Sequence, residues 1–585
     1  MCGRSDLVLN TIASWLLCSL AGIAAAQTPD LILIHGKILT VDAKDSVVEA
    51  VAIAKGKIVA VGSSAEIQRR AKPMTQVIDL HGLTATPGLI DAHGHFAIGG
   101  VDEMFRVVLS DTERVSDVLD KIRKKAASLQ PGEWLVGAGW DEGKLAERRY
   151  LLASDLDKIT PNNPVWLTHT TQHYGVANSY ALKLAQITDS TPDPPAGTID
   201  RDAQGRPTGV LKEAAQAMVV KLIPQTTPEQ WQRGILHTVE GLHREGMTAV
   251  KEVAIIPPIW DAYRELLRQN NLNERVFVLW DAGHTLESAK AALAKISALP
   301  DHTASLGDGL LVSGGAKIFM DGSGGARTAW MHEAWNKNST QTDTGNTGYP
   351  ATDPQVYRQQ VRLFHQASVH VGTHAIGDRA IDWVVDTYSE VLKEKPTRGL
   401  RHSVIHGNLP TDHTIDVMAA LQRRYDAGYP EAQAPFMWWI GDNYAGNFGP
   451  QRSQRLEPFK TWLAKGVQWA GGSDYSVTPY PARYGIWASL ERETLKGVYG
   501  AHPFGTSEAI DVHTALRSYT AWAARQLFLE DRIGTIEPGK DADIAVWDRD
   551  LYTVPASDIK NLKCELTIFG GRIVFRDPTA RIPIQ

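Results

Sequence analysis

Two histidines at the end of one apolar stretch are the first candidates for chemistry. The stretch runs from Thr86 to His95 (TPGLIDAHGH) and is typical of a buried strand. Side chains two residues apart on a strand point to the same side, so His93 and His95 can face one point while Gly94 faces away. Two neutral imidazoles so placed suit a divalent metal such as zinc, iron or nickel. A hydrogen-bonded histidine pair would explain the pattern equally well, so further ligands are required.

Four later strand-like stretches carry residues with the reach to complete such a site. Taken singly, each residue would be explained as a hydrogen-bonded core histidine, a capping aspartate or an ion-paired lysine. Unrelated structural needs would not be expected to place them on successive strands, at or near the strand ends. We therefore predict one metal centre formed with His93 and His95 by Lys317, His374, His406 and Asp474.

The segments between these residues indicate the elements that position them. Strand-like runs alternate with stretches of helical periodicity, such as residues 354–370 and 381–394. This alternation predicts an α/β fold, a (β/α)8 TIM-like barrel over residues 85–529, with its chemistry at the carboxyl ends of the strands. Residues 101–241 are too many for one barrel loop, so we expect them to contain an inserted substructure with a hairpin near residues 197–209.

Short strands separated by glycine turns occur near both ends of the chain. They lie between Asp30 and Ile78 and again between Ala542 and Val574. Strands at both ends of a long α/β segment predict one small β-sandwich domain built from residues 27–84 and 530–585.

Length and composition limit the class of protein. The chain has 585 residues, 43% hydrophobic and 22% charged, which is typical of a folded protein with more than one domain. The net charge is −6 and the sequence contains no block of basic residues, so nucleic acid and anionic membranes are not expected partners. A homo-oligomer is compatible with this composition.

The N-terminus has the pattern of a secretory signal peptide. Arg4 precedes an apolar run over residues 7–26 that ends in three alanines. A membrane anchor is the alternative, but the run barely reaches spanning length, so we expect cleavage after Ala26 and no stable membrane anchor. The predicted location is periplasmic or secreted. Cleavage would remove Cys2 and Cys18 and leave Cys564 alone, so we expect no intrachain disulfide and a metal site made from His, Asp, Glu or Lys.

The order His-x-His, Lys, His, His, Asp resembles the amidohydrolase superfamily of metal-dependent hydrolases. The stretch from Thr86 to His95 is similar to its first-strand motif, and residues 533–544 (IGTIEPGKDADI) are similar to its return into a β-sandwich. Further motifs resemble the amidohydrolase 3 branch, which includes N-substituted formamide deformylases and D-aminoacylase-like enzymes. They are residues 137–141 (GAGWD), 209–213 (GVLKE), 317–323 (KIFMDGS) and 471–474 (GGSD), together with His173, Asn178 and Ser179.

The resemblance implies a role for each predicted ligand. His93 and His95 would bind one metal with Asp474, and His374 and His406 would bind a second. Lys317, carboxylated by carbon dioxide, would bridge two ions, with zinc expected and iron, nickel or manganese as alternatives. Lys251 and Glu252 are rival bridges. The predicted reaction is attack by a metal-bound hydroxide, with Asp474 as the proton shuttle.

Weaker candidates and departures from the branch concern the substrate. His173 is expected to contact the oxyanion or the substrate, although a packed histidine is as good an interpretation. Trp438 and Arg452 are expected to contact an acyl or aryl group, against the alternative of packing in an exposed lid. We expect structural roles for His169, His402, Asp321 and Arg327. Glu252 replaces an aspartate frequent in relatives, and residues 433–438 (QAPFMW) lack an expected histidine.

The leading hypothesis is a metal-dependent hydrolase that cleaves a C–N amide-type bond of a small N-formyl or N-acyl amine. Within the superfamily the alternatives are a cyclic-amide, carbamate or ester hydrolase or a deaminase. From another class, the alternative is a non-catalytic binding or regulatory protein stabilised by metal. The complete ligand set, Asp474 included, argues against the last, because a degraded homologue would be expected to lose its proton shuttle first.

Overall fold

The computed structural model describes residues 27–299, 308–336, 345–580 and 582. The predicted signal peptide, residues 1–26, lies outside these ranges, and Cys2 and Cys18 with it. Cys564 is buried as a free thiol. In the described part of the chain, no helix combines the length and the apolar character needed to cross a membrane.

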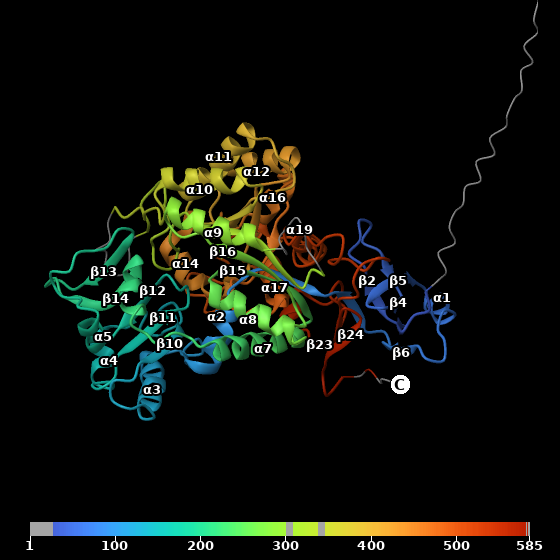
Figure 1. The fold of residues 1–585 in the computed structure, drawn as a ribbon, viewed down its shortest axis with the longest axis horizontal. Coiled ribbons are helices and arrows are strands. Elements are labelled where there is room, and N and C mark those ends of the chain that lie inside the picture. Colours follow the sequence, from blue (N-terminus) through green and yellow to red (C-terminus); the bar gives the residue numbers. More distant parts are fainter. Residues whose placement is uncertain (1–26, 300–307, 337–344, 581, 583–585) are drawn as a thin grey trace, which may run out of the picture.

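An eight-stranded parallel sheet forms a nearly closed barrel at the centre of the molecule (Figure 1). The strands are neighbours in chain order, and a parallel bridge between Gly94 and Tyr475 brings the end of the barrel back to its beginning. The predicted TIM-like barrel is therefore confirmed. Its strands are β8 (Leu89–Gly94), β15 (Met247–Ile255), β16 (Arg275–Asp281), β17 (Leu311–Phe319), β18 (His370–Ala375), β19 (Ser403–His406), β20 (Tyr429–Ala432) and β21 (Ala470–Gly471).

Asp91 holds the seam between the first and last strands. Its carboxylate accepts hydrogen bonds from the backbone N–H groups of His93 at 3.0 Å and Ser473 at 3.1 Å. Gly472 lies so close to β8 that a Cβ atom there would come 2.8 Å from the backbone nitrogen of His93. Any larger residue would push the two strands apart. The seam thus places the end of β21 beside the His-x-His pair.

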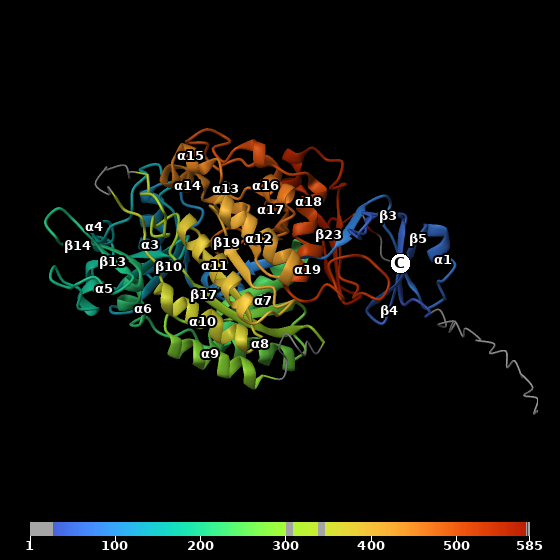
Figure 2. The same cartoon turned by 90° about the horizontal axis from the view of Figure 1, so that it is seen from above.

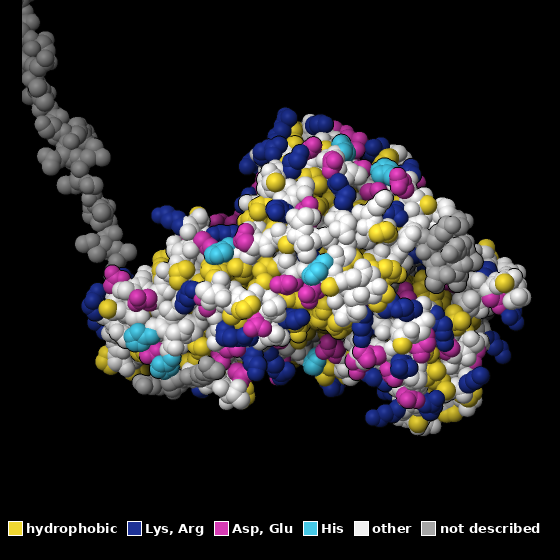
Figure 3. Space-filling view, turned by 180° about the vertical axis from the view of Figure 1, so that it is seen from behind, with side chains coloured by type: hydrophobic (Ala, Val, Ile, Leu, Met, Phe, Trp, Pro, Cys, Tyr) yellow, Lys and Arg dark blue, Asp and Glu magenta, His cyan; other side chains and the backbone are white. Residues whose placement is uncertain are grey.

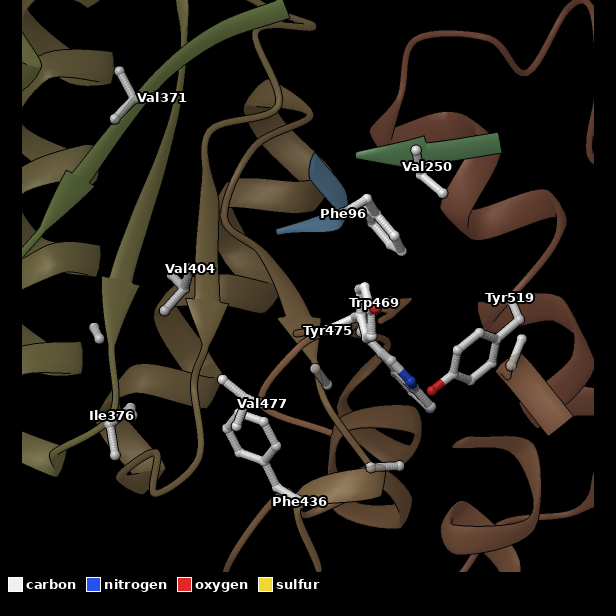
Figure 4. Packing of buried hydrophobic residues seen from close by; sticks show 14 of the residues in the cluster. Phe96, Val250, Val371, Ile376, Val404, Phe436, Trp469, Tyr475, Val477 and Tyr519 are labelled. Atoms are coloured by element: carbon white, nitrogen blue, oxygen red, sulfur yellow. The ribbon is translucent and has the colours of Figure 1, made fainter. Parts of the chain in front are cut away.

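Helices cover the outside of the barrel (Figure 2). Val371 of β18 and Val404 of β19 belong to a buried cluster that also contains Val361 and Phe364 of the neighbouring helix, α10 (Figure 4). Burying such apolar faces is the main source of stability for helices of this length. The covering helices include α7 (Pro228–Arg244), α8 (Pro257–Arg268), α9 (Leu286–Ala298), α10 (Pro354–Gln366), α11 (Asp378–Glu394) and α12 (Asp412–Tyr425).

The helix expected over residues 354–370 ends earlier than predicted. Helix α10 stops at Gln366, and Ser368 adopts a left-handed φ of 59°. The backbone N–H of Val369 then donates to the carbonyl of Phe364 at 2.9 Å, which closes the helix. His370 pairs with Gly315 instead and begins β18. Helix α11 covers residues 381–394 as expected and begins one turn earlier.

A six-stranded sheet lies beside the barrel within the long segment expected to hold an insertion (Figure 1). Strands β13 and β14 pair antiparallel and form the expected hairpin. The flanking helices α2 (Phe96–Phe105) and α7 pack on each other, since the Thr238 hydroxyl donates to the carbonyl of Phe96 at 3.1 Å. These two helices belong to the barrel wall, so the inserted sheet takes up only part of residues 101–241. Its strands are β9 (Val107–Val108), β10 (Leu135–Trp140), β11 (Val165–His169), β12 (Tyr174–Ala177), β13 (Gly197–Arg201) and β14 (Pro207–Glu213).

Two sheets at the opposite side of the barrel contain strands from both ends of the chain (Figures 1 and 2). One has the order β5-β4-β1-β6, and the other has the order β24-β23-β22-β7-β2-β3. Strand β7 pairs with β22 and leads directly into β8, so this composite β domain anchors the first barrel strand. The strands are β1 (Leu31–Ile34), β2 (Lys37–Leu39), β3 (Val47–Val48), β4 (Ala50–Ala54), β5 (Lys57–Gly62), β6 (Gln76–Asp79), β7 (Thr84–Pro87), β22 (Ile544–Trp547), β23 (Cys564–Phe569) and β24 (Arg572–Arg576).

Candidate metal centre

All six predicted ligands lie at or near the carboxyl ends of barrel strands. His93 and His95 lie at the end of β8, Lys317 on β17, and Asp474 directly after β21. His374 and His406 lie at the ends of β18 and β19. Five strands therefore direct these side chains toward the end of the barrel where catalytic groups gather in this fold.

Asp474 and Lys317 meet the first histidine pair directly. The Oδ1 atom of Asp474 lies 3.3 Å from Nε2 of His93 and 3.3 Å from Nε2 of His95. The Nζ atom of Lys317 lies 3.4 Å from the same nitrogen of His93. Burial alone would raise the pKa of Asp474, but His93 and His95, which lie beside the carboxylate, hold the pKa well below its usual range. The carboxylate is therefore ionised at neutral pH, as a metal ligand must be.

The second histidine pair lies against the first. The rings of His374 and His406 have centroids 4.5 Å apart, and the ring of His406 is 5.1 Å from that of His93. His374 contacts the carbonyl oxygen of Gly322 through Nε2 at 2.9 Å, and His406 contacts Oε1 of Gln433 through Nδ1 at 2.6 Å. Because both partners are acceptors, these nitrogens carry the protons, and Nδ1 of His374 and Nε2 of His406 keep their lone pairs for a metal.

The chemistry of this donor set fits a divalent transition metal. His93, His406 and Asp474 each offer a ligand atom within 4.8 Å of the others. Oδ1 of Asp474 is buried and makes no hydrogen bond within the described structure. Burial lowers the pKa of His374 and of His406 well below the ordinary value, which keeps both imidazoles neutral. Buried neutral imidazoles with an ionised carboxylate are the ligands that zinc and its neighbours prefer.

Lys317 is the lysine that reaches the histidines. Burial lowers the pKa of its amine to about 7, although the charges of Asp474 and Glu431 oppose the shift. The neutral amine is the form that can react with carbon dioxide. Lys251, the rival, donates instead to Oε1 of Glu431 at 2.6 Å, and both side chains are fully buried. Strand β16 lies between β15, which carries Lys251, and β17, which carries Lys317.

Glu252 faces away from the ligand cluster. Its Oε2 atom accepts hydrogen bonds from the backbone N–H of Ala97 at 2.9 Å and from the Tyr263 hydroxyl at 2.6 Å. The carboxylate thus holds the start of α2, directly after His95, against α8. These contacts and the alternation of side chains along β15 favour a structural role for Glu252, and its role as a bridge stays an untested prediction.

His173 approaches the centre from the inserted sheet. Its ring lies 5.1 Å from the ring of His374, and its Nδ1 atom lies 2.9 Å from Oε2 of Glu213. Burial would lower the pKa of His173, but the neighbouring Glu213 charge outweighs it and raises the pKa. The structure therefore places an imidazole, held by a carboxylate, beside the ligands. The oxyanion role of His173 stays a prediction.

The residues expected to be structural have structural contacts. Asp321 accepts the backbone N–H groups of Trp330, Ile376 and Gly377 at 2.9–3.1 Å, which ties the loops after β17 and β18 together. His402 accepts the N–H of Val371 at 3.1 Å and contacts His365 at 2.9 Å. Arg327 lies within the loop after β17 and is 6% exposed.

His169 belongs to a second group of possible ligands, with Asp141 and Glu142. Its Nδ1 atom accepts the backbone N–H of Thr171 at 3.1 Å, so Nε2 carries the proton. That nitrogen points at the Tyr174 hydroxyl at 2.9 Å and at Glu142 at 3.1 Å. In the structure these residues form a hydrogen-bond network of the inserted sheet, which is the structural role expected for His169.

The two substrate candidates lie between the seventh and eighth strands, as expected, but in different surroundings. Trp438 of α13 (Pro435–Trp439) lines a cavity between the barrel and the inserted sheet. Arg452 of α15 (Pro450–Ser453) donates to the carbonyl of Phe448 at 2.8 Å and lies over the ring of Trp335. It is not among the residues that line this cavity or the ligand cluster.

Three site residues escaped the sequence analysis. Glu431 lies on β20, and Gln433 directly follows it. Oε2 of Glu431 lies 3.7 Å from Nδ1 of His93, and the side chain of Gln433 contacts His406. Phe436 stacks on His406 with centroids 5.6 Å apart, in the turn where a histidine was expected. The strand-end rule that located the other ligands applies to Gln433, whereas the packing of Phe436 has no sequence signal.

A buried cluster of histidine, aspartate and lysine at the carboxyl end of a (β/α)8 barrel defines a metal-dependent hydrolase. The model of the amidohydrolase family matches residues 76–575, and the chain belongs to this family. It is therefore an enzyme, a metal-dependent hydrolase of carbon–nitrogen bonds.

Similar proteins cover nearly the whole chain. The chain is 28% identical to the putative amidohydrolase YtcJ of Bacillus subtilis, over 90% of this chain and 96% of that protein. It is 28% identical to the N-substituted formamide deformylase of Arthrobacter pascens, over 93% and 98% of the two chains. A solved metal-dependent hydrolase from Pyrococcus horikoshii has the same fold, with a TM-score of 0.69, 24% identity and coverage of 90% and 99%.

Proposed function

We propose that the enzyme hydrolyses the C–N bond of small N-formyl or N-acyl amines. One observation carries the proposal: Oδ1 of Asp474 lies 3.3 Å from Nε2 of His93 and 3.3 Å from Nε2 of His95, within the ligand cluster. A carboxylate there can receive the proton of an attacking water and return it to a leaving nitrogen. The similarity to an N-substituted formamide deformylase over 93% of the chain supports this substrate class.

His93 and His95 would hold one metal with Asp474, and His374 and His406 would hold a second. Lys317, whose Nζ atom lies 3.4 Å from Nε2 of His93, would in a carboxylated form help to hold these metals. Zinc fits these ligands, and iron, nickel or manganese are the alternatives. When bound, such ions acidify water and polarise a carbonyl oxygen.

The side chains of the protein perform the remaining steps. Asp474 accepts the proton of the attacking water through Oδ1 and passes it to the nitrogen of the scissile bond. This second transfer is essential, because an amine leaves only when protonated. His173, oriented by Glu213, donates a hydrogen bond to the carbonyl oxygen as negative charge develops there.

The test is turnover by protein loaded separately with each of the four metals. The panel comprises N-formyl and N-acetyl amines, a cyclic amide, a carbamate, an ester and an aminopurine, with release of amine, acid or ammonia measured for each. We expect metal-dependent release of formate or acetate with the amine. Hydrolysis confined to the cyclic amide, carbamate or ester, or deamination alone, would replace the proposed substrate class.

We further propose a periplasmic or secreted location, supported by the apolar run over residues 7–26. Expression with and without residues 1–26, followed by fractionation and N-terminal sequencing, tests this. We expect the mature chain to begin at Gln27 outside the cytoplasm. Retention of the intact chain in the cytoplasm or the membrane would contradict the proposal.

A further inference from the structure

A cavity of about 750 Å³ lies between the barrel and the inserted sheet. Its walls come from α2, from strands β9–β11, from the loop after β21 and from the end of α13. Val220, which ends α6 (Ala217–Val220), is 43% exposed and lines the cavity, which places one side of it at the molecular surface. Cavities of this size between substructures bind ligands the size of two or three fused rings.

This cavity shares a wall with the ligand cluster. Gln172 and Tyr475 line the cavity, whereas their chain neighbours His173 and Asp474 line the small space around the ligands. Two segments, residues 170–173 and 474–478, form this wall. They touch where the Thr170 hydroxyl donates to the carbonyl of Val477 at 2.9 Å. The cavity and the ligand cluster are therefore directly adjacent.

The lining is mainly aromatic and aliphatic. Trp438 packs against Trp439 and Tyr484, with ring centroids 5.1 and 4.9 Å apart. Trp166, Ile98 and Val108 add further apolar surface. Rings held by packing present rigid apolar faces, on which another ring stacks favourably.

The charged groups of the lining are paired. Arg106 is the one lysine or arginine among the described lining residues, and it lies 2.7 Å from Asp102. Glu103 accepts the Tyr475 hydroxyl at 2.7 Å and contacts His237 at 2.9 Å. A carboxylate entering the cavity would lose its hydration and meet no unpaired lysine or arginine among the described lining residues, which is unfavourable.

We propose that this cavity binds a bulky uncharged aromatic substituent of the substrate, and that the enzyme prefers aryl or arylalkyl amides to N-acyl amino acids. The inference rests on the proposed amide hydrolysis and adds the kind of substituent that the substrate carries. It gives the inserted sheet, which lines the cavity together with the loop that follows Asp474, a role in substrate binding.

The test compares three substrates that share the formyl group: N-(2-naphthylmethyl)formamide, N-methylformamide and N-formyl-3-(2-naphthyl)alanine. We expect kcat/KM to be highest for the first by at least about tenfold over each of the others. The variant Val220→Lys places a cation in the lining. The control Leu222→Lys makes the same change two residues away, at a side chain that is 37% exposed and outside the lining.

In Val220→Lys the preference for the naphthylmethyl over the carboxylated substrate should fall about fivefold to tenfold, while Leu222→Lys keeps it. Calorimetric titration with 2-naphthylmethanol measures binding without turnover. We expect this neutral probe to bind the wild type and Leu222→Lys alike and to bind Val220→Lys several-fold more weakly. Equal binding by all three, or equal turnover of all three formamides, would overturn the inference and leave amide hydrolysis intact. Failure to hydrolyse any amide while the probe binds as expected would overturn only the proposed function.

Discussion

Lys317 contacts the first histidine pair from β17, which makes it the residue on which metal binding should depend most. Its Nζ atom is 3.4 Å from Nε2 of His93, while Lys251 is engaged with Glu431. A lysine that carries no carboxylate in the metal-bound state would be a cation beside two ions, which is electrostatically unfavourable. We therefore expect substitution of Lys317 and substitution of Lys251 to affect metal binding differently.

Lys317→Ala should lose most of its metal and its activity, because the bridge between the two histidine pairs disappears. Elemental analysis after loading and desalting measures the loss, and short carboxylic acids should restore part of the metal. Lys251→Met, also fully buried, serves as the comparison: it should lose stability yet retain the larger share of metal. The assignment fails if Lys317→Ala binds metal like the wild type.

Asp474→Asn should reduce kcat by roughly 10²–10⁴-fold, because the amide cannot accept the proton of the attacking water. Its melting temperature should remain close to that of the wild type, and its metal content should fall less than in Lys317→Ala. A conservative comparison is Asp321→Asn, which alters a loop contact and not the proton path. Wild-type turnover in Asp474→Asn would remove the proton shuttle from the mechanism.

At the scale of elements, the loops after β19 and β20 are held together by Glu457. Its Oε1 atom accepts the backbone N–H of Gln433 and the side-chain amide of Asn408, each at 3.0 Å. Since Gln433 holds His406, Glu457 supports the cluster through one intermediate residue. Its carboxyl is fully buried, and burial raises its pKa to about 7.

This raised pKa predicts a pH-dependent stability. In the unfolded chain a glutamate ionises near pH 4.5. Between pH 4.5 and 7 the folded protein therefore keeps a proton on Glu457 that the unfolded chain releases. The wild type therefore loses stability as pH rises through this window. Glu457→Gln stays neutral, and its free energy of unfolding relative to wild type should rise by on the order of 3 kcal/mol from pH 4.5 to 8.

Denaturant unfolding at several pH values measures this difference. Glu240→Gln, whose side chain is 66% exposed on α7, is the control and should show little pH-dependent change. A difference between Glu457→Gln and wild type that does not change with pH would show that Glu457 ionises normally.

The order of strands and their polar ends could be predicted from the sequence, because period-two apolar runs and strand-end histidines leave a local signal. His93, His374 and His406 were found in this way. The role of Glu252 could not, since which face of β15 is inside depends on the neighbouring strands. The early end of α10 at Gln366 also had no clear sequence signal, because Ser368 takes a left-handed conformation that serine rarely adopts.

At the scale of the whole molecule, Arg275 ties the barrel to the composite β domain. From the start of β16 it lies 2.7 Å from Asp543 and 3.1 Å from Asp541, and all three side chains are buried. Elsewhere, charges of both signs are intermixed over the face of the molecule in Figure 3. A buried pair with one partner removed leaves a charge without compensation.

Arg275→Met should lower the free energy of unfolding by about 3 kcal/mol or more, because Asp543 would remain buried without its cation. Arg572→Met, an exposed arginine on the neighbouring β24, should cost less than about 1 kcal/mol. The midpoints of thermal and urea unfolding measure both. Similar losses in the two variants would mean that the buried ion pair does not hold the domains together.

The pairing of β7 with β22 has a consequence for how the chain is made. Strand β7 leads into the strand of His93, yet its partner β22 begins at Ile544, close to the end of the chain. During synthesis β7 waits, unpaired on that side, until the chain has been made as far as β22. Unpaired strand edges attract other chains, so nascent copies of this enzyme should depend on chaperones until β22 has emerged.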